Sequence, residues 1–160
     1  MTSMQHCLLW SAEDVAIRFL ESLAVGDAEI ARHLLAPEVR YRFAGVWVGR
    51  GRDQVSQVLQ RVAGGHGRFD VAIHDVAADN PDTPVRQRAG AVEMVRTLRT
   101  DHLRVGLVHL QFAVRGMARI RDGKIAVWED SVDAGVMASA LGRGLLGTVV
   151  PGVRPHLPRA

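Results

Sequence analysis

The sequence predicts an α+β protein in which about three N-terminal helices and one C-terminal helix pack on a curved, mostly antiparallel β-sheet. Apolar residues recur at helical spacing through the first third of the chain. The period changes to two from Phe69 onward, and Asp122-Gly123 between two alternating segments is a strong hairpin signal. Early helices followed by a long meander favour helices covering one face of a bent sheet, whose open mouth forms a pocket.

Three helices are expected before the meander. Ser11 can cap a helix that ends at Gly26, and its first turn carries two acids that suit the helix dipole. Asp27 caps a second helix that Pro37 stops. A third begins near Asp53, and the glycine-rich residues 64–67 end it.

The strands and the closing helix follow from alternation and turn residues. The expected segments are a strand over 39–48 broken at Gly45, a strand over 69–76, a loop over 79–84, strands over 91–105, 107–121 and 124–132, and a helix over 133–146. Residues 1–10 and 151–160 are expected to be irregular tails of one domain that spans residues 1–160.

Composition narrows the function classes. Hydrophobic residues make up 48% of the 160-residue chain and charged residues 23%, which is ordinary for a globular protein. The net charge of +3 is spread along the chain, and aromatic residues are few, so we expect no nucleic-acid partner. The single cysteine, the N-terminus without a signal-peptide pattern and the absence of a run of about 20 apolar residues lead us to expect a cytoplasmic protein without a membrane span.

One strand carries charge on an apolar face. In the segment 95–105, side chains point alternately to the two faces of the strand. Arg99 and Asp101 therefore lie on the same face as Val95, Leu103 and Val105. Burying charge is costly unless it is paired and hydrogen-bonded. The pair is therefore either a compensated structural ion pair or a working site.

The last strand repeats this pattern. Trp128 and Asp130 share an apolar face, so two carboxylates and one guanidinium meet if both faces line one cavity. Two carboxylates in different environments hold different protonation states at neutral pH. A protonated acid donates to a leaving oxygen, while an ionised one takes a proton from water. Such a trio suits the opening of a strained ring by water in one step.

These segments resemble a known family. Residues 99–103 and 122–133 are similar to limonene-1,2-epoxide hydrolases, within the NTF2-like, SnoaL-like superfamily of cone-shaped α+β folds, and the resemblance extends over roughly residues 12–135. It implies a cofactor-independent, metal-free epoxide hydrolase that adds water to a small or medium apolar epoxide to give a vicinal diol. It also implies a homodimer.

The resemblance assigns roles to single residues. Asp101 matches the general acid, Asp130 the general base, Arg99 the link between them, and Tyr41 a residue that holds the water. We expect three further residues to line the substrate pocket: Phe43, Trp128 and Leu103.

Two departures keep alternatives open. Phe43 stands where the family usually has an Asn that binds the water, and Glu129 and Ser131 replace the residues that usually flank the base. An epoxide-opening cyclase or isomerase and a non-catalytic protein that binds an apolar ligand therefore remain candidate functions.

Other patterns give weaker indications. The histidines, among them His102 and His109 on adjacent expected strands, lack the spacing of metal ligands, so no metal site is expected. The apolar, glycine-rich segment 135–150 is expected to be partly buried, either over the pocket mouth or in a dimer contact.

Overall fold

The computed structural model describes residues 10–63, 67–79 and 90–149. The two predicted tails lie outside this range, apart from Trp10, and so do residues 80–84 of the predicted loop. The elements along the chain are α1 (Ala12–Ala24), α2 (Ala28–Leu34), β1 (Leu35–Phe43), β2 (Val46–Arg50), α3 (Arg52–Ala63), β3 (Gly67–Ala78), β4 (Val92–Val105), β5 (Val108–Arg121), β6 (Lys124–Ser131) and α4 (Ala134–Val149).

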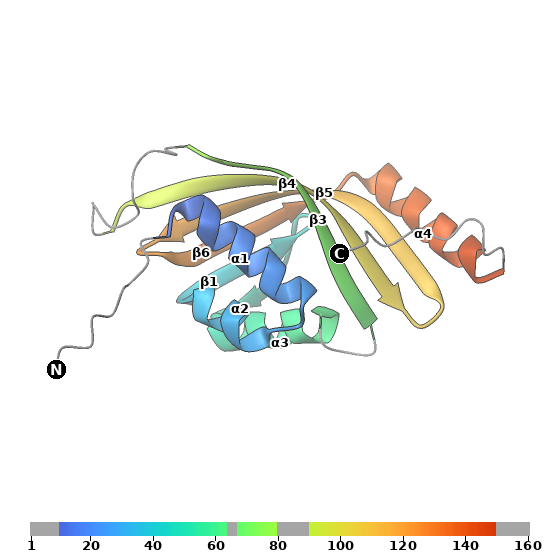
Figure 1. Ribbon diagram of the computed structural model, residues 1–160, viewed down its shortest axis with the longest axis horizontal. Coiled ribbons are helices and arrows are strands. Elements are labelled where there is room, and N and C mark those ends of the chain that lie inside the picture. Colours follow the sequence, from blue (N-terminus) through green and yellow to red (C-terminus); the bar gives the residue numbers. More distant parts are fainter. Residues whose placement is uncertain (1–9, 64–66, 80–89, 150–160) are drawn as a thin grey trace.

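The six strands form one curved sheet in the order β2-β1-β6-β5-β4-β3. Every neighbouring pair is antiparallel except β1 and β6, which run parallel. Figure 1 shows the sheet bending over α1, α2 and α3, which lie together on its concave side. The predicted α+β architecture is confirmed, and a cavity lined by residues of α1, α3 and the strands lies on this side of the sheet.

The first helix fixes one wall of that space. Ser11 accepts a hydrogen bond from the Asp14 amide and Asp14 accepts one from the Ser11 amide, so the predicted cap is a full capping box. The helix then places Phe19 and Leu20, both almost fully buried, against the sheet. Phe19 packs on Trp128 of β6 with ring centroids 4.7 Å apart.

Two tight turns set the register of the sheet. Ala44 and Gly45 join β1 to β2 with φ of 48° and 84°, and Asp122 and Gly123 join β5 to β6 with φ of 51° and 73°. Two successive residues with positive φ match the right-handed twist of a two-residue hairpin. The sequence-based prediction of a hairpin at Asp122-Gly123 is confirmed, and the expected break at Gly45 is a second hairpin.

The main difference from the sequence-based boundaries lies after α2. This helix ends at Leu34, and Leu35 already belongs to β1, where it is fully buried opposite Ile125 of β6. The predicted stop residue, Pro37, therefore lies inside a strand. The pairing of β1 with β2 begins only at Arg40. Pro37, which has no backbone N–H, therefore removes no hydrogen bond from the β1–β2 ladder.

The last helix packs against β5 with one face and exposes the other. Ala140, Gly144 and Gly147 are buried, and a Cβ at Gly144 would lie only 2.6 Å from the carbonyl oxygen of His109. The partial burial expected for segment 135–150 is therefore found, and the small residues permit it. The described helices include none long and apolar enough to cross a membrane.

Candidate active site

The candidate residues come from three strands of the curved sheet, which are β4, β6 and β1. Arg99 and Asp101 lie on β4, Asp130 lies on β6, and β5 runs between these two strands. Tyr41 comes from β1, where it pairs with Trp128 of β6. The alternation predicted from the sequence is correct, because Arg99, Asp101 and Asp130 all face inward and are no more than 4% exposed.

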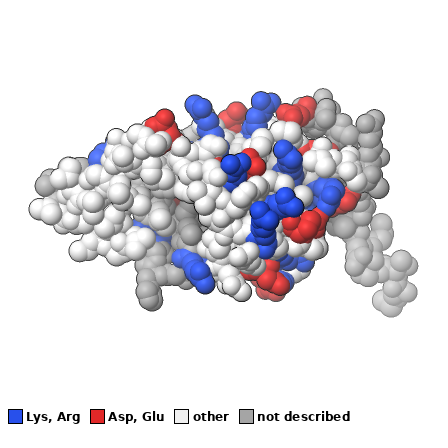
Figure 2. Space-filling view, turned by 180° about the vertical axis from the view of Figure 1, so that it is seen from behind, with Lys and Arg blue, Asp and Glu red and all other residues white. Residues whose placement is uncertain are grey.

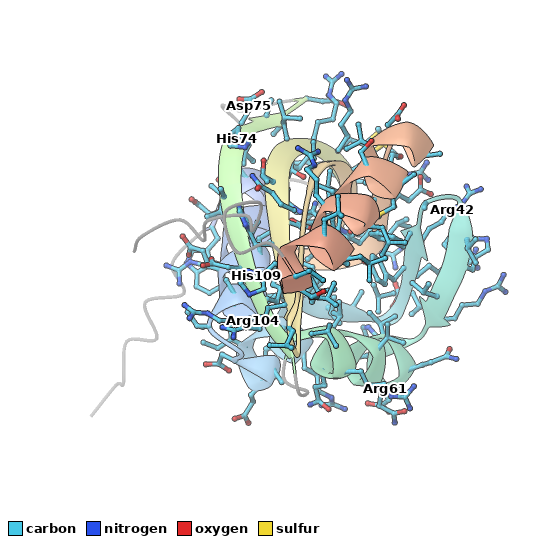
Figure 3. All side chains as sticks on the ribbon, turned by 90° about the vertical axis from the view of Figure 1, so that its right-hand side faces the viewer. Arg42, Arg61, His74, Asp75, Arg104 and His109 are labelled. Atoms are coloured by element: carbon cyan, nitrogen blue, oxygen red, sulfur yellow. The ribbon has the colours of Figure 1, made fainter. Side chains whose placement is uncertain are left out.

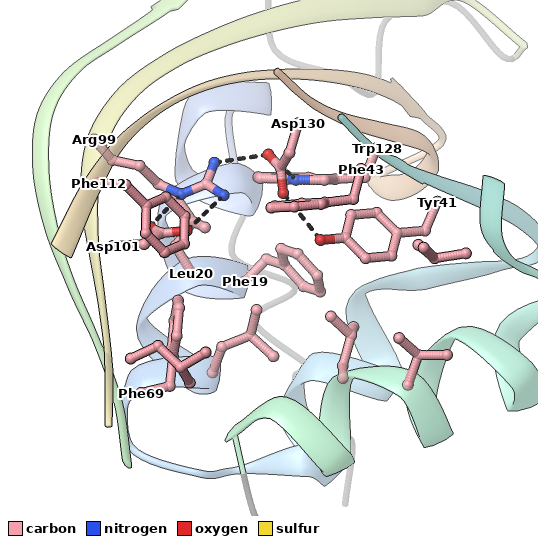
Figure 4. A pocket seen from close by; sticks show the side chains of 15 residues that line it. Phe19, Leu20, Tyr41, Phe43, Phe69, Arg99, Asp101, Phe112, Trp128 and Asp130 are labelled. Carbon is pink, nitrogen blue, oxygen red and sulfur yellow. Dashed lines mark hydrogen bonds and ion pairs between the residues drawn. The ribbon is translucent and has the colours of Figure 1, made fainter. Parts of the chain in front are cut away.

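Arg99 bridges the two acids (Figure 4). Its Nε donates to Asp101 Oδ1 at 2.8 Å and its Nη2 to Asp101 Oδ2 at 3.2 Å, which is a bidentate contact. Its Nη1 donates to Asp130 Oδ1 at 2.9 Å and to Thr97 Oγ1 at 3.5 Å. The guanidinium thus fixes the separation and orientation of both carboxylates.

Asp130 receives two further hydrogen bonds. Tyr41 Oη donates to Asp130 Oδ2 at 3.1 Å, and Trp128 Nε1 donates to Asp130 Oδ1 at 2.8 Å. With the Arg99 contact, this carboxylate accepts from three donors on three different side chains.

Asp101 lies in a different environment. Burial raises the pKa of its carboxyl above the ordinary value of 3.8, although the Arg99 charge opposes this shift. For Arg99 itself, burial disfavours the cation, but Asp130 and Asp101 outweigh that effect and raise its pKa. Burial, together with Asp130, raises the pKa of Tyr41 well above 10, so the phenol keeps its proton. The site therefore combines a permanent cation, a phenol donor and one carboxyl that is biased toward its neutral form.

These polar groups lie at one end of an apolar cavity of about 280 Å³. All four phenylalanines of the chain line it, together with its single tyrosine and Trp128. Besides these aromatic residues and the charged trio, the lining consists of Leu20, Leu23, Val48, Val58, Leu59 and Leu103. A pocket of this kind binds an apolar molecule and presents it to a few polar groups.

The three residues that were predicted to line a substrate pocket all line this cavity, with different contacts. Leu103 and Phe43 contribute apolar surface. Phe43 pairs with Asp130 in the β1–β6 register, so the departure from the family pattern places a hydrocarbon ring beside the candidate base. Trp128 is 2% exposed and also donates to Asp130, a contact that the sequence analysis did not predict. Its position two residues before Asp130 on the same strand face is the signal that was available.

Within the described ranges, no group of three His, Cys, Asp or Glu residues is placed to hold a metal ion. His74 and His109 lie far apart in Figure 3, and His74 hydrogen-bonds to Thr100 at 2.8 Å. His102 is buried, and its Nδ1 atom has no hydrogen-bond partner among the residues that the structure describes.

Comparison with known proteins agrees with this geometry. Residues 11–143 match the model of the limonene-1,2-epoxide hydrolase catalytic domain. The chain is 34% identical over 139 residues to the epoxide hydrolase EphG of Mycobacterium tuberculosis, covering 87% of this chain and 85% of that one. A solved structure of an M. tuberculosis LEH-like epoxide hydrolase superposes with a TM-score of 0.78 at 31% identity, covering 91% of this chain and 95% of that chain.

More distant structures share the fold alone. An NTF2-like protein of unknown function from Cytophaga hutchinsonii has a TM-score of 0.57 at 11% identity, and the match covers 77% of this chain and 90% of that chain. The fold is therefore NTF2-like, as the sequence resemblance implied.

The chain belongs to the limonene-1,2-epoxide hydrolase catalytic-domain family. It is an epoxide hydrolase, and the comparisons do not favour a cyclase, an isomerase or a non-catalytic binding protein.

Replacing Arg99 tests the electrostatic role of the guanidinium. In Arg99→Ala, two buried carboxylates are left without their shared cation, and removing one partner of a buried ion pair costs about 3–5 kcal/mol. We expect the free energy of unfolding, measured with urea at neutral pH, to fall by about that amount. The matched control is Arg96→Ala on the same strand, where the side chain is 71% exposed and pairs with Asp79. That change should cost at most about 1 kcal/mol. Equal losses of stability in the two variants would contradict this role.

Proposed function

We propose that the chain opens epoxides in one general acid/base step, with Asp101 as the acid and Asp130 as the base. The observation that carries this proposal is the single buried guanidinium that contacts both carboxylates, at 2.8 Å and 2.9 Å. Two acids held by one cation in a low-dielectric site support opposite proton-transfer roles.

Asp101 protonates the epoxide oxygen in this proposal. The buried carboxyl has a raised pKa, and a general acid works best when its pKa lies near the working pH. As the ring C–O bond breaks, the electron pair goes to the oxygen, which takes the Asp101 proton. The carboxylate that remains is stabilised by the bidentate contact with Arg99.

Asp130 takes the proton from the attacking water. The water oxygen forms the new bond to an epoxide carbon, and the proton it loses goes to Asp130. In this proposal Tyr41, which donates to Asp130 Oδ2 at 3.1 Å, orients that water. The step leaves Asp101 ionised and Asp130 protonated, so a proton must return to Asp101 before the next turnover. The product is a vicinal diol that contains one oxygen from water.

We propose that the substrate is a small or medium apolar epoxide. A cavity of about 280 Å³ lined almost entirely by hydrocarbon side chains supports this substrate class. The proposed roles of Asp101, Asp130 and Tyr41 require no cofactor.

Single-turnover labelling tests the one-step mechanism. With enzyme in excess over epoxide in oxygen-18 water, direct attack by water predicts one oxygen-18 atom in every diol molecule. Asp101→Asn and Asp130→Asn should each lower kcat by about a hundredfold or more, because each removes a proton-transfer group. The matched control is Glu129→Gln, which alters the neighbouring carboxylate of β6 and should leave kcat nearly unchanged. Unlabelled diol in the first turnover would indicate a covalent ester and overturn the mechanism.

The pH dependence follows from the role of Asp101. The acid must be protonated to act, so kcat should fall as the pH rises through the raised pKa of this carboxyl. Because burial raises that pKa, activity should persist at pH values well above those at which an exposed aspartic acid ionises. A kcat profile between about pH 5 and pH 9 measures the decline. A rate that increased steadily to the alkaline end would remove Asp101 as the acid.

We also propose a cytoplasmic homodimer. The exposed face of α4 supports the dimer, because it carries Leu141, Leu145, Leu146 and Val149. Charged side chains are sparse at the left-hand end of the molecule in Figure 2, which corresponds to the α4 side of Figure 1.

Light scattering after size exclusion should give twice the chain mass of 17.5 kDa for the natural protein. Leu145→Glu should shift it toward the monomer, and a monomeric natural protein would contradict the proposal. The single cysteine supports the cytoplasm, which fractionation of the source cells tests.

A further inference from the structure

A glycine lies in the middle of β5, a strand of 14 residues. Glycine weakens a strand interior, since it has no side chain to pack and loses more conformational freedom on folding. Gly116 is not among the residues with positive φ, so its backbone conformation is open to any residue. The reason for a glycine at this position is therefore space.

The volume that a Cβ at Gly116 would occupy lies beside Arg99 and Asp130. Gly116 pairs with Thr97 of β4 on one side and with Asp130 of β6 on the other. A Cβ at this position would lie 2.3 Å from Thr97 Oγ1, 2.8 Å from Arg99 Nη1 and 3.2 Å from Asp130 Oδ1. Two of these three atoms are the ones that join the guanidinium to the candidate base.

The geometry of the sheet explains why the bridge crosses here. Adjacent strands lie about 4.8 Å apart, so β4 and β6 are separated by about 10 Å with β5 between them. Arg99 pairs with Val114, and its side chain must run across β5 to reach Asp130. The inward residues on either side of Gly116 are Val114 and Ala118, both fully buried. Because Gly116 has no side chain, a gap remains between Val114 and Ala118 on the inward face of β5.

We propose that Gly116 is a positioning residue for epoxide opening, because the missing side chain lets Arg99 reach Asp130 across β5. This inference rests on the proposed roles of Asp101 and Asp130. Gly116 does not line the cavity that would hold the substrate. Its replacement should therefore impair the chemical step and leave substrate binding nearly unchanged.

A simple crowding effect is the competing explanation, since the tightest contact of the added methyl group would be with Thr97. The pair Thr97→Ala and Thr97→Ala/Gly116→Ala separates the two. Thr97→Ala removes the Thr97 hydroxyl and its γ-methyl group, so both variants lack the hydrogen bond from Arg99 Nη1 to Thr97. The double variant adds one methyl group on β5 without the 2.3 Å contact, but it keeps the 2.8 Å contact with Arg99 Nη1. Thr97→Ala is the reference for the double variant.

Steady-state kinetics on one apolar epoxide then gives the answer. Relative to Thr97→Ala, the double variant should show a kcat about a hundredfold lower, the effect of a misplaced catalytic group, with KM changed by less than about threefold. Equal kcat in the two variants, or a change confined to KM, overturns the proposal.

A crystal structure of the double variant provides a readout that does not depend on turnover. Arg99 Nη1 should lie beyond hydrogen-bond distance of Asp130 Oδ1, while the guanidinium keeps its bidentate hydrogen bonds to Asp101. A guanidinium still within hydrogen-bond distance of Asp130 overturns the proposal, whatever the labelling experiment shows about the mechanism. Failure of the proposed function appears instead in the natural protein, as unlabelled diol or no diol.

Discussion

The interaction on which the structure depends is the buried contact of one guanidinium with two carboxylates. A cation in an apolar interior is stable only when its charge and its donors are satisfied, and Arg99 satisfies them with Asp101, Asp130 and Thr97. These partners lie on β4 and β6, so the contact also requires β5 to run between them in register. The electrostatics of the site and the pairing of the three strands therefore stabilise each other.

The curvature of the sheet brings this ion-pair network to the wall of a cavity. Because α1 and α3 cover the concave face without filling it, a cavity remains in front of the acids. The chain concentrates its few aromatic side chains there, and the core behind Trp128 is built mainly from Val, Leu, Ile and Ala. The apolar wall lowers the effective dielectric constant around the polar end, which strengthens the electrostatic interactions of the charged groups there.

Local sequence patterns predicted much of this arrangement, because side chains along a β-strand point alternately to its two faces. Strand periodicity placed Arg99, Asp101 and Asp130 on inward faces, and Asp122-Gly123 predicted the hairpin that brings β6 beside β5. The roles of Asp101, Asp130 and Tyr41 came from the family resemblance, and they remain proposals. The parallel pairing of β1 with β6 was not predicted, because strand order depends on contacts between distant segments. The early end of α2 was missed because burial of Leu35 in the sheet outweighs local helix signals.

The contacts of Trp128 and Gly116 show what sequence patterns cannot predict. An inward tryptophan is typical of a core, and only the three-dimensional structure shows that its Nε1 atom donates to Asp130. A glycine inside a strand indicates a close approach, but not the identity of the approaching atom. Such details depend on side-chain directions across three strands, which one strand's sequence does not encode.

The proposed mechanism requires one property of the site above all, which is that the two buried acids sharing the Arg99 cation hold unlike protonation states. Neutron diffraction from deuterium-exchanged crystals at neutral pH measures this property directly. We expect a deuteron on the Asp101 carboxyl, none on Asp130, and a fully deuterated Arg99 between them. A deuteron on Asp130 with a bare Asp101, or two bare carboxylates, would contradict the assignment of acid and base.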